Sequence, residues 1–144
     1  MAGFDCEGGR GKGAAAFVAR ALRAKGYWNV FTFVPSVRDC PEPIVVRPRE
    51  WERKGRLDDG TEYGLERVRV YVCMDSQMDA DSTVVAVQRD LHTAIWASLI
   101  ASEGVRIVAI DMDAECDLGR DGSGRWVRSV DVLCTVVVPG GDEE

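Results

Sequence analysis

Residues 105–116 read VRIVAIDMDAEC, residues 117–125 read DLGRDGSGR, and residues 126–138 read WVRSVDVLCTVVV. The first and third segments are rich in β-branched residues, whereas the middle segment is polar and carries three glycines. Two strand-like runs joined by a glycine-bearing tip are typical of an antiparallel hairpin. We therefore predict that a long β-hairpin closes the chain.

Regular alternation would divide the first arm of this hairpin into two faces. One face would carry core residues, namely Val108, Ile110, Met112 and Ala114. The other face would become acidic towards the tip, with Asp111, Asp113, Glu115 and Asp117 in one row. Such residues would lie about 6–7 Å apart, because a strand rises roughly 3.3 Å per residue.

A helix is predicted directly before the hairpin, over roughly Ser82–Ser102. Apolar residues recur there at steps of three and four, at Val84, Val87, Leu91, Ile95 and Leu99. Trp96 and Ile100 widen this stripe enough to cover a sheet. Asp81 or Ser82 would be the N-cap, and Glu103-Gly104 would end the helix.

The elements before this helix are predicted from the same periodicities. An apolar stripe indicates a helix over Lys12–Ala24, and β-branched and aromatic residues indicate a strand over Tyr27–Val34. Prolines bound a short strand at Ile44–Arg47, which suggests a sheet edge. Residues 49–65 are polar and are expected to form an excursion or loop, and Arg67–Met74 alternates like a half-buried strand.

The resulting order is helix, three strands, helix, two strands. It predicts an α+β fold, with a mostly antiparallel sheet and two helices packed on one face. The length of 144 residues suits one domain. We expect that domain to span residues 12–139, between a flexible glycine-rich leader at 1–11 and a flexible tail at 140–144.

Composition narrows the functional classes. The formal charge of −6 argues against specific nucleic-acid recognition. No apolar run reaches the roughly 18–20 residues of a membrane span, and the acidic, glycine-rich start does not resemble a signal peptide, so synthesis in the cytoplasm is expected. The five cysteines include no C-x-x-C pair, and therefore no metal site is predicted.

Motifs for catalysis or cofactor binding are not convincing. Gly8–Gly13 resembles a phosphate-binding loop but lacks its first glycine, where Cys6 stands, and its Ser or Thr, where Gly13 stands. The single histidine, His92, has no partner that the sequence identifies, and a structural role is expected for it. We therefore predict a protein that is not an enzyme and uses no cofactor.

The acidic row is also unlike a calcium loop. Counted from Asp111, the positions that require glycine and glutamate hold Cys116 and Gly122. A solvent face or charged rim is the preferred interpretation. Trp126, directly after the tip, would either contact another subunit or cap the open end of the core. The residues predicted for a subunit interface or channel are Asp111, Asp113, Glu115, Arg120, Asp121 and Trp126.

The element order resembles that of the tail terminators of tailed phages and the related minor tail and neck proteins. The matching segments are Lys12–Ala24, Tyr27–Val34, Ile44–Arg47, Arg67–Met74, Ser82–Ser102 and Val105–Val138, and residues 128–138 look much like the last strand of such proteins. The resemblance implies a homo-oligomeric ring, commonly a hexamer, at the tail or head–tail junction of a virion. Its partners would be tail-tube or head–tail connector proteins. Asp111, Asp113 and Glu115 would then face an axial channel and repel DNA phosphates.

Two other functions remain open from the sequence. A small-ligand-binding or regulatory α+β module would require a closed apolar pocket. An uncharacterised enzyme would require His92 and the acidic row to converge on one site.

Overall fold

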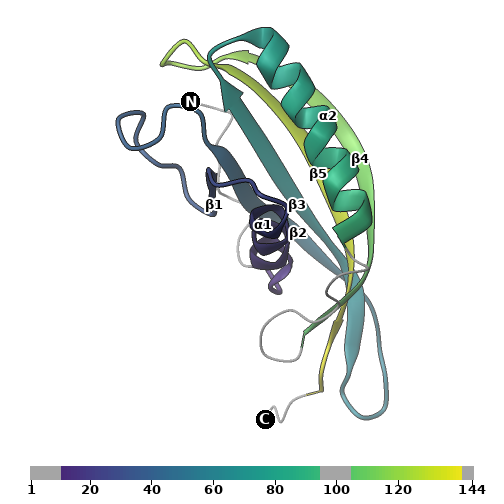
Figure 1. The fold of residues 1–144 in the computed structure, drawn as a ribbon. Coiled ribbons are helices and arrows are strands. Elements are labelled where there is room, and N and C mark those ends of the chain that lie inside the picture. The colour runs from purple at the N-terminus through teal and green to yellow at the C-terminus, as the bar shows by residue number, and fades with distance from the viewer. Residues whose placement is uncertain (1–10, 95–104, 141–144) are drawn as a thin grey trace.

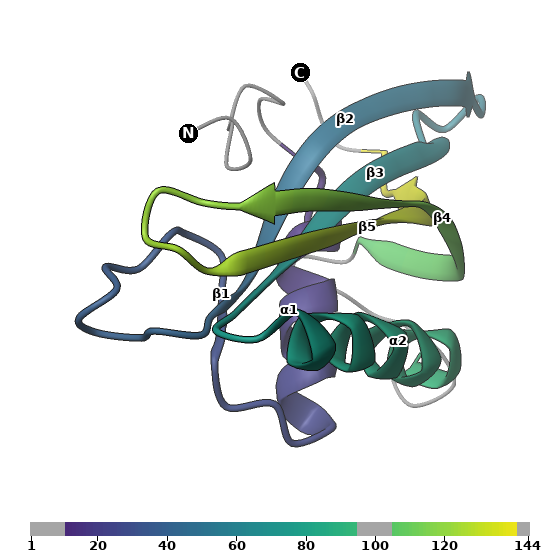
Figure 2. The ribbon, with the colours of Figure 1, turned by 90° about the horizontal axis from the view of Figure 1, so that it is seen from above.

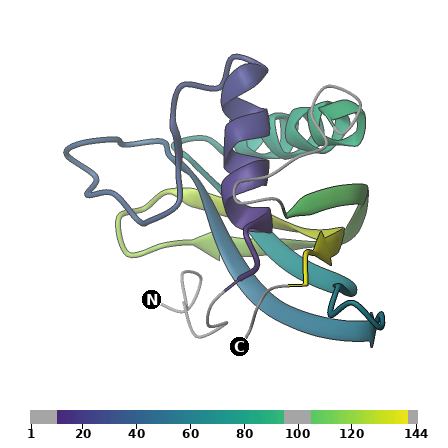
Figure 3. The same ribbon diagram turned by 90° about the horizontal axis from the view of Figure 1, so that it is seen from below.

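The chain folds as an α+β protein with a five-stranded sheet and two helices on one face (Figure 1). The computed structural model describes residues 11–94 and 105–140. The strand order is β1-β2-β3-β5-β4, and every pairing is antiparallel except β1 with β2. Figures 2 and 3, which view the molecule from opposite directions, both place the helices on the same side of the sheet. The predicted fold class is confirmed.

Helix α1 (Ala14–Ala24) lies across the β1–β3 half of the sheet. Phe17, Val18 and Leu22 are buried beneath it, as their helical spacing predicts. Gly13 precedes the helix with a φ of 101°, a conformation in which a side chain would be strained. The tip of the Tyr27 side chain then donates a hydrogen bond of 2.7 Å to Asp90 on α2 and ties the two helices together.

The predicted strand over Tyr27–Val34 is much shorter in the structure. Only β1 (Val30–Phe31) pairs with the sheet, against Ile44 and Val45. The following residues leave the sheet towards Pro35, and Trp28 is 80% exposed. β1 covers only the first two residues of β2 (Ile44–Arg56), so the rest of β2 forms an edge, consistent with Pro43 before the strand and Pro48 within it.

The prediction that residues 49–65 form a polar excursion or loop is wrong. β2 continues to Arg56 and, after a turn, β3 (Glu62–Met74) returns beside it. The two strands pair through Arg56 and Glu62, which also form an ion pair of 2.6 Å. Gly60 in the turn has a φ of 91°. The far end of the arm, residues 52–64, lies beyond the end of the helices in Figure 1. Its side chains are largely polar and exposed, so the sequence shows no alternation there.

Helix α2 (Gln77–Ala94) starts earlier than predicted. Its first turn is capped by the Ser76 hydroxyl, which accepts a hydrogen bond of 3.0 Å from the Asp79 amide, and not by Asp81 or Ser82. Val84, Val87 and Leu91 are buried against the sheet, as predicted. The predicted positions Ile95, Trp96, Leu99 and Ile100, together with the predicted end at Glu103-Gly104, lie outside the described residues.

The closing hairpin is confirmed as β4 (Arg106–Arg120) and β5 (Trp126–Val138). β4, however, is interrupted by register shifts between Ile107 and Ala109, between Met112 and Glu115, and between Asp117 and Gly119. The first shift moves Ile107 into the core and leaves Val108 45% exposed. The prediction of core positions is therefore right for Ile110 and Met112 and wrong for Val108 and Ala114.

Two apolar cores lie on opposite faces of the sheet. The larger one is between the sheet and the helices, and it includes Val68, Val70 and Val72 of β3. The smaller one is on the other face and consists of Val45, Tyr71, Cys73 and Val127. The Arg67–Met74 segment is thus buried on both faces at its end, whereas alternation predicted a half-buried strand.

Candidate interaction surface

The face of the sheet opposite the helices, here called the open face, carries a row of residues across four strands. Glu50 on β2 pairs with Arg67 on β3, which pairs with Leu133 on β5, which pairs with Asp111 on β4. Cross-strand partners share a face, so an exposed carboxylate stands at each end of this row. The row is the best-defined candidate surface of the molecule.

A shallow depression lies within this surface. It is lined by Glu50, Glu52, Leu65, Arg67 and Leu133. Leu65 and Leu133 are partly exposed between the charged groups. Apolar residues surrounded by polar ones are typical of protein contact surfaces.

Ion pairs fix the arginines of the open face. Arg67 Nη1 lies 2.7 Å from Asp113 Oδ2 and 2.9 Å from Asp131 Oδ2, and Arg69 Nε lies 2.6 Å from Asp131 Oδ1. Burial acts to raise the pKa of the Asp131 carboxyl, but the hydrogen bonds from Arg69 and Arg67 together hold that pKa below its ordinary value. Asp131 is therefore a buried anion that orients two basic side chains.

The predicted acidic row is split by the second bulge of β4. Asp111 and Asp113 lie on the open face, where Asp113 contacts Arg67. Glu115 instead pairs with the core residue Val130 and lies on the helix side. The prediction that Asp111, Asp113 and Glu115 share one face is wrong, because the extra residue between Met112 and Glu115 reverses the alternation.

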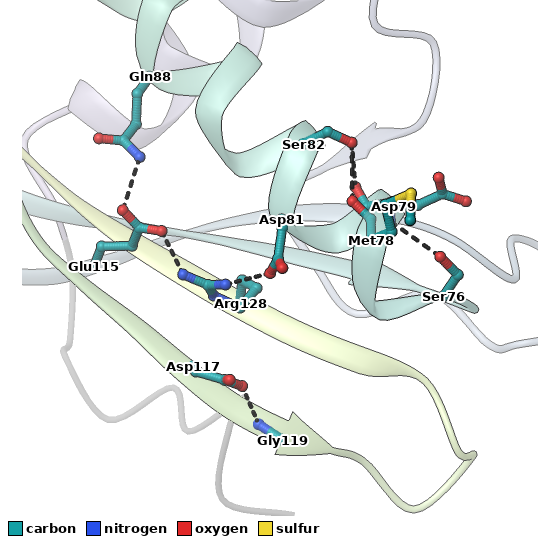
Figure 4. A network of polar contacts seen from close by, with 10 residues as sticks. All are labelled: Ser76, Met78, Asp79, Asp81, Ser82, Gln88, Glu115, Asp117, Gly119 and Arg128. Atoms are coloured by element: carbon teal, nitrogen blue, oxygen red, sulfur yellow. Dashed lines mark hydrogen bonds and ion pairs between the residues drawn. The ribbon is translucent and has the colours of Figure 1, made fainter.

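On the helix side, Glu115 belongs to a network that joins α2 to the hairpin (Figure 4). Its carboxylate accepts hydrogen bonds from Gln88 and from Arg128, and Arg128 also pairs with Asp81 of α2. Asp117, nearer the tip, accepts a hydrogen bond of 2.9 Å from the amide of Gly119. The network positions the helix, and its carboxylates are engaged by the protein itself.

Asp121 and Arg125 hold the hairpin tip together. Asp121 accepts hydrogen bonds from the amides of Ser123 and Arg125, and its carboxylate pairs with the Arg125 guanidinium at 2.8 Å. These bonds outweigh burial and lower the pKa of the Asp121 carboxyl. Arg125, 5% exposed, also donates to the carbonyl of Pro41, so the tip is tied to the loop at residues 32–43 (Figure 2).

Arg120 and Trp126 form a separate pair at the base of the tip. The Arg120 guanidinium carbon lies 5.0 Å from the centre of the Trp126 ring. Trp126 is partly buried and packs against the larger core. Packing against the core is compatible with the predicted capping role, and the partly exposed side chain keeps the subunit contact a proposal.

The glycine-rich segment before α1 encloses an internal anion. The Glu66 carboxylate is buried and accepts hydrogen bonds from the amides of Lys12, at 2.9 Å, and Ala14, at 3.2 Å. A Cβ on Gly11 would lie 2.0 Å from Glu66 Oε2. Burial raises the pKa of Glu66 despite these bonds. The place at the helix N-terminus where a phosphate could bind is thus filled by Glu66.

The remaining sequence candidates are dispersed. His92 is exposed near the end of the described part of α2. Cys73 and Cys134 are buried, whereas Cys116 is exposed. In residues 11–94 and 105–140, no group of three or more His, Cys, Asp or Glu side chains could hold a metal ion. No helix within those ranges is long and apolar enough to cross a membrane.

Sequence reasoning missed Arg67, Arg69, Asp131 and the exposed Trp28. A weak signal existed for the first three, since two arginines alternate with valines in β3 and a lone aspartate interrupts the valine-rich β5. Cross-strand register brings Arg69 opposite Asp131, and that pairing could not be read from either strand alone.

Comparison with known proteins gives a likeness of fold. No protein-family model and no curated protein matches the chain. One chain of a solved virion of a native gene transfer agent (GTA) particle is similar in structure, with a TM-score of 0.59 and 18% sequence identity. The match covers 88% of this chain and 94% of that chain. At this identity the likeness establishes a shared fold over nearly the whole length of both chains.

Proposed function

We propose that the chain is a structural, non-enzymatic component of a phage or phage-like particle. The observation that carries this proposal is the shared fold with a chain of a gene transfer agent virion, which extends over 94% of that chain. A fold hosts many functions in general. The match nevertheless covers nearly all of both chains, and not only a common supersecondary motif. This extent favours a role for this chain in a particle similar to the role of the matched chain.

The finer proposal is a tail terminator or neck protein that forms a ring at the tail or head–tail junction. The order of the elements supports it, since helix, three strands, helix and closing hairpin follow the pattern of such proteins. In this arrangement the partners are copies of this chain and tail-tube or connector proteins, and the site of action is the virion. Asp111 remains a candidate for a channel lining, whereas Asp113 is paired with Arg67 and Glu115 is engaged with Gln88 and Arg128.

The test combines the assembly state with the composition of particles. Native mass spectrometry and electron microscopy of the purified chain should reveal a closed ring of defined size. Mass spectrometry of particles purified from the source strain should detect this chain at a low, fixed ratio to the major tail protein. A chain that is monomeric throughout a wide concentration range and missing from particles would contradict the proposal.

The ligand-binding alternative receives no support from the depression on the open face. Three of its five lining residues are charged, whereas that alternative predicts a closed apolar pocket. Thermal unfolding in the presence of a metabolite library is the matching experiment, because a ligand that binds the folded state raises the melting temperature.

A further inference from the structure

The Glu66 carboxyl group is enclosed between the sheet and the short segment that leads into α1. Its side chain is 0% exposed, and its cross-strand partners are Trp51 of β2 and Cys134 of β5. Residues 11–13 lie directly against it, since a Cβ on Gly11 would be 2.0 Å from Glu66 Oε2. Removing an ionised carboxylate from water is costly unless hydrogen bonds compensate it. The fit of this segment therefore depends on the charge of Glu66.

The two oxygens of Glu66 are bonded unequally. Oε1 accepts hydrogen bonds from the amides of Lys12, at 2.9 Å, and Ala14, at 3.2 Å. Oε2 accepts only a share of the Lys12 amide, at 2.9 Å, among the bonds of the described residues. A protonated carboxyl keeps one oxygen that can accept two bonds. A proton on Oε2 thus leaves both amides bonded to Oε1 and removes the buried charge.

Few charged groups act on Glu66 from the elements that surround it. From the segment before α1, the charge of Lys12 favours the ionised form. From β5, Cys134 is adjacent, and burial raises the pKa of its thiol to about 12, so it is neutral. Further along the same face, Arg53 of β2 and Glu62 of β3 pair with each other at 3.4 Å. Within the described residues, no guanidinium pairs with Glu66 to offset its burial.

We propose that Glu66 makes the docking of residues 11–13 on the sheet dependent on pH, with firm docking in acid and looser docking as the pH rises. The Ala14 amide opens the first turn of α1, so that turn should loosen together with the segment. The Lys12 ammonium, 5.4 Å from the centre of the Trp51 ring, should leave the ring as well. This inference does not depend on the proposed role in a particle.

The sign follows from the two environments of the carboxyl. In the docked state burial raises the pKa of Glu66, although the amide bonds and the charge of Lys12 act to lower it. When residues 11–13 lift away, water reaches the carboxyl and its pKa returns towards the ordinary value of 4.5. The docked state therefore binds the proton more tightly. Its advantage is complete below the ordinary pKa and is lost as the pH rises through the docked pKa.

Amide hydrogen exchange measures this docking directly. NMR follows the amides of Lys12 and Ala14 from about pH 5 to about pH 8, and protection factors remove the intrinsic effect of pH on exchange. The Glu66→Gln variant keeps one oxygen acceptor without a charge that titrates. The matched control is Glu50→Gln, which makes the same change at an exposed position on β2.

In wild type, the protection of the Lys12 and Ala14 amides should fall at least about threefold over this range. The control should show the same fall, whereas Glu66→Gln should keep its protection constant. Wild-type protection that is independent of pH, or that increases with pH, would overturn the proposal. An equal fall in Glu66→Gln would overturn it too, because the titrating group would then be another one.

A second variant keeps the test decisive if circular dichroism shows that Glu66→Gln does not fold. The new Cβ of Gly11→Ala would collide with Glu66 Oε2, so it should displace residues 11–13 at every pH. The Lys12 and Ala14 amides should then be poorly protected in acid as well, while the amide of Val70 in β3 stays protected. Unchanged protection of Lys12 and Ala14 in Gly11→Ala would show that the Glu66 contact does not hold the segment.

Discussion

Asp131 is the single residue with the most concentrated charge interactions on the open face. Its side chain is 5% exposed and meets two arginines. The Asp131→Asn change should lower the free energy of unfolding by about 1–3 kcal/mol at neutral pH, because it weakens hydrogen bonds between charged groups and leaves a poorer partner for each arginine.

The pH dependence of this loss has a defined sign. The pKa of Asp131 is lower in the folded than in the unfolded chain, so the ionised form favours folding above pH 3.8 and that contribution fades as pH falls through the folded pKa. The gap between wild type and Asp131→Asn should therefore narrow in acid. Urea unfolding between neutral and acidic pH measures it, with Asp39→Asn as a control at an exposed position. A gap that is constant with pH would contradict this origin.

Also at the residue scale, Glu66 shows that the glycine motif before α1 does not identify the group it binds. The glycines at Gly8–Gly13 resemble a phosphate-binding loop that lacks two of the residues the motif requires. The structure places Gly11 and the amides of Lys12 and Ala14 around the Glu66 carboxylate. Lys12 and Ala14 are 54 and 52 residues from Glu66 in the chain. The rest of the predicted leader, residues 1–10, lies outside the described residues. The glycine pattern indicates that backbone amides can surround a negatively charged group. It does not show that this group is the carboxylate of Glu66 on β3.

At the scale of the element, the bulge in β4 places Asp111 and Glu115 on opposite faces of the sheet. Substitutions of the two residues should therefore differ in their effect on stability. Glu115→Gln should destabilise the protein by about 0.5–1 kcal/mol, because it weakens the ion pair between Glu115 on β4 and Arg128 on β5, and Arg128 also pairs with Asp81 of α2. Asp111→Asn should change stability by less than about 0.5 kcal/mol, since Asp111 is exposed and forms no ion pair with the residues that the structure describes.

Chemical denaturation measures both changes, and hydrogen exchange in α2 localises the effect of Glu115→Gln. Faster exchange is expected in the turns that carry Asp81 and Gln88. Equal losses from the two substitutions would mean that the acidic row is a uniform face after all.

The elements also show which signals a sequence carries. The hairpin arms and the buried face of α2 were predictable because each buries one face and therefore shows a period. The bulges of β4 were not, since an extra residue is accommodated by the partner strand and leaves no mark on composition. The second half of β2 was missed for another reason: exposed on both faces and rich in ion pairs, it has the polarity of a loop.

On the scale of the whole molecule, the sheet separates two cores of unequal size. The larger one is enclosed by two helices. The smaller one, under the loop at 32–43 and the hairpin tip, consists of four of the described residues. Arg125 joins this loop to the tip through the Pro41 carbonyl and Asp121. We expect the smaller core to open without loss of the larger one, because few apolar contacts hold it.

Each core contains a buried cysteine whose reactivity reports whether that core opens. Arg125→Ala should open only the smaller core. Burial raises the pKa of the Cys73 thiol in the smaller core and of the Cys134 thiol in the larger core, each to about 12, so neither should react with a thiol reagent in wild-type protein. Arg125→Ala should loosen the tip and make Cys73 reactive, while Cys134 stays protected. Mass spectrometry of labelled peptides measures both, and the exposed Cys116 should label in wild type and variant alike. Labelling of Cys73 and Cys134 at the same rate would instead show that the sheet and both its cores open as one unit.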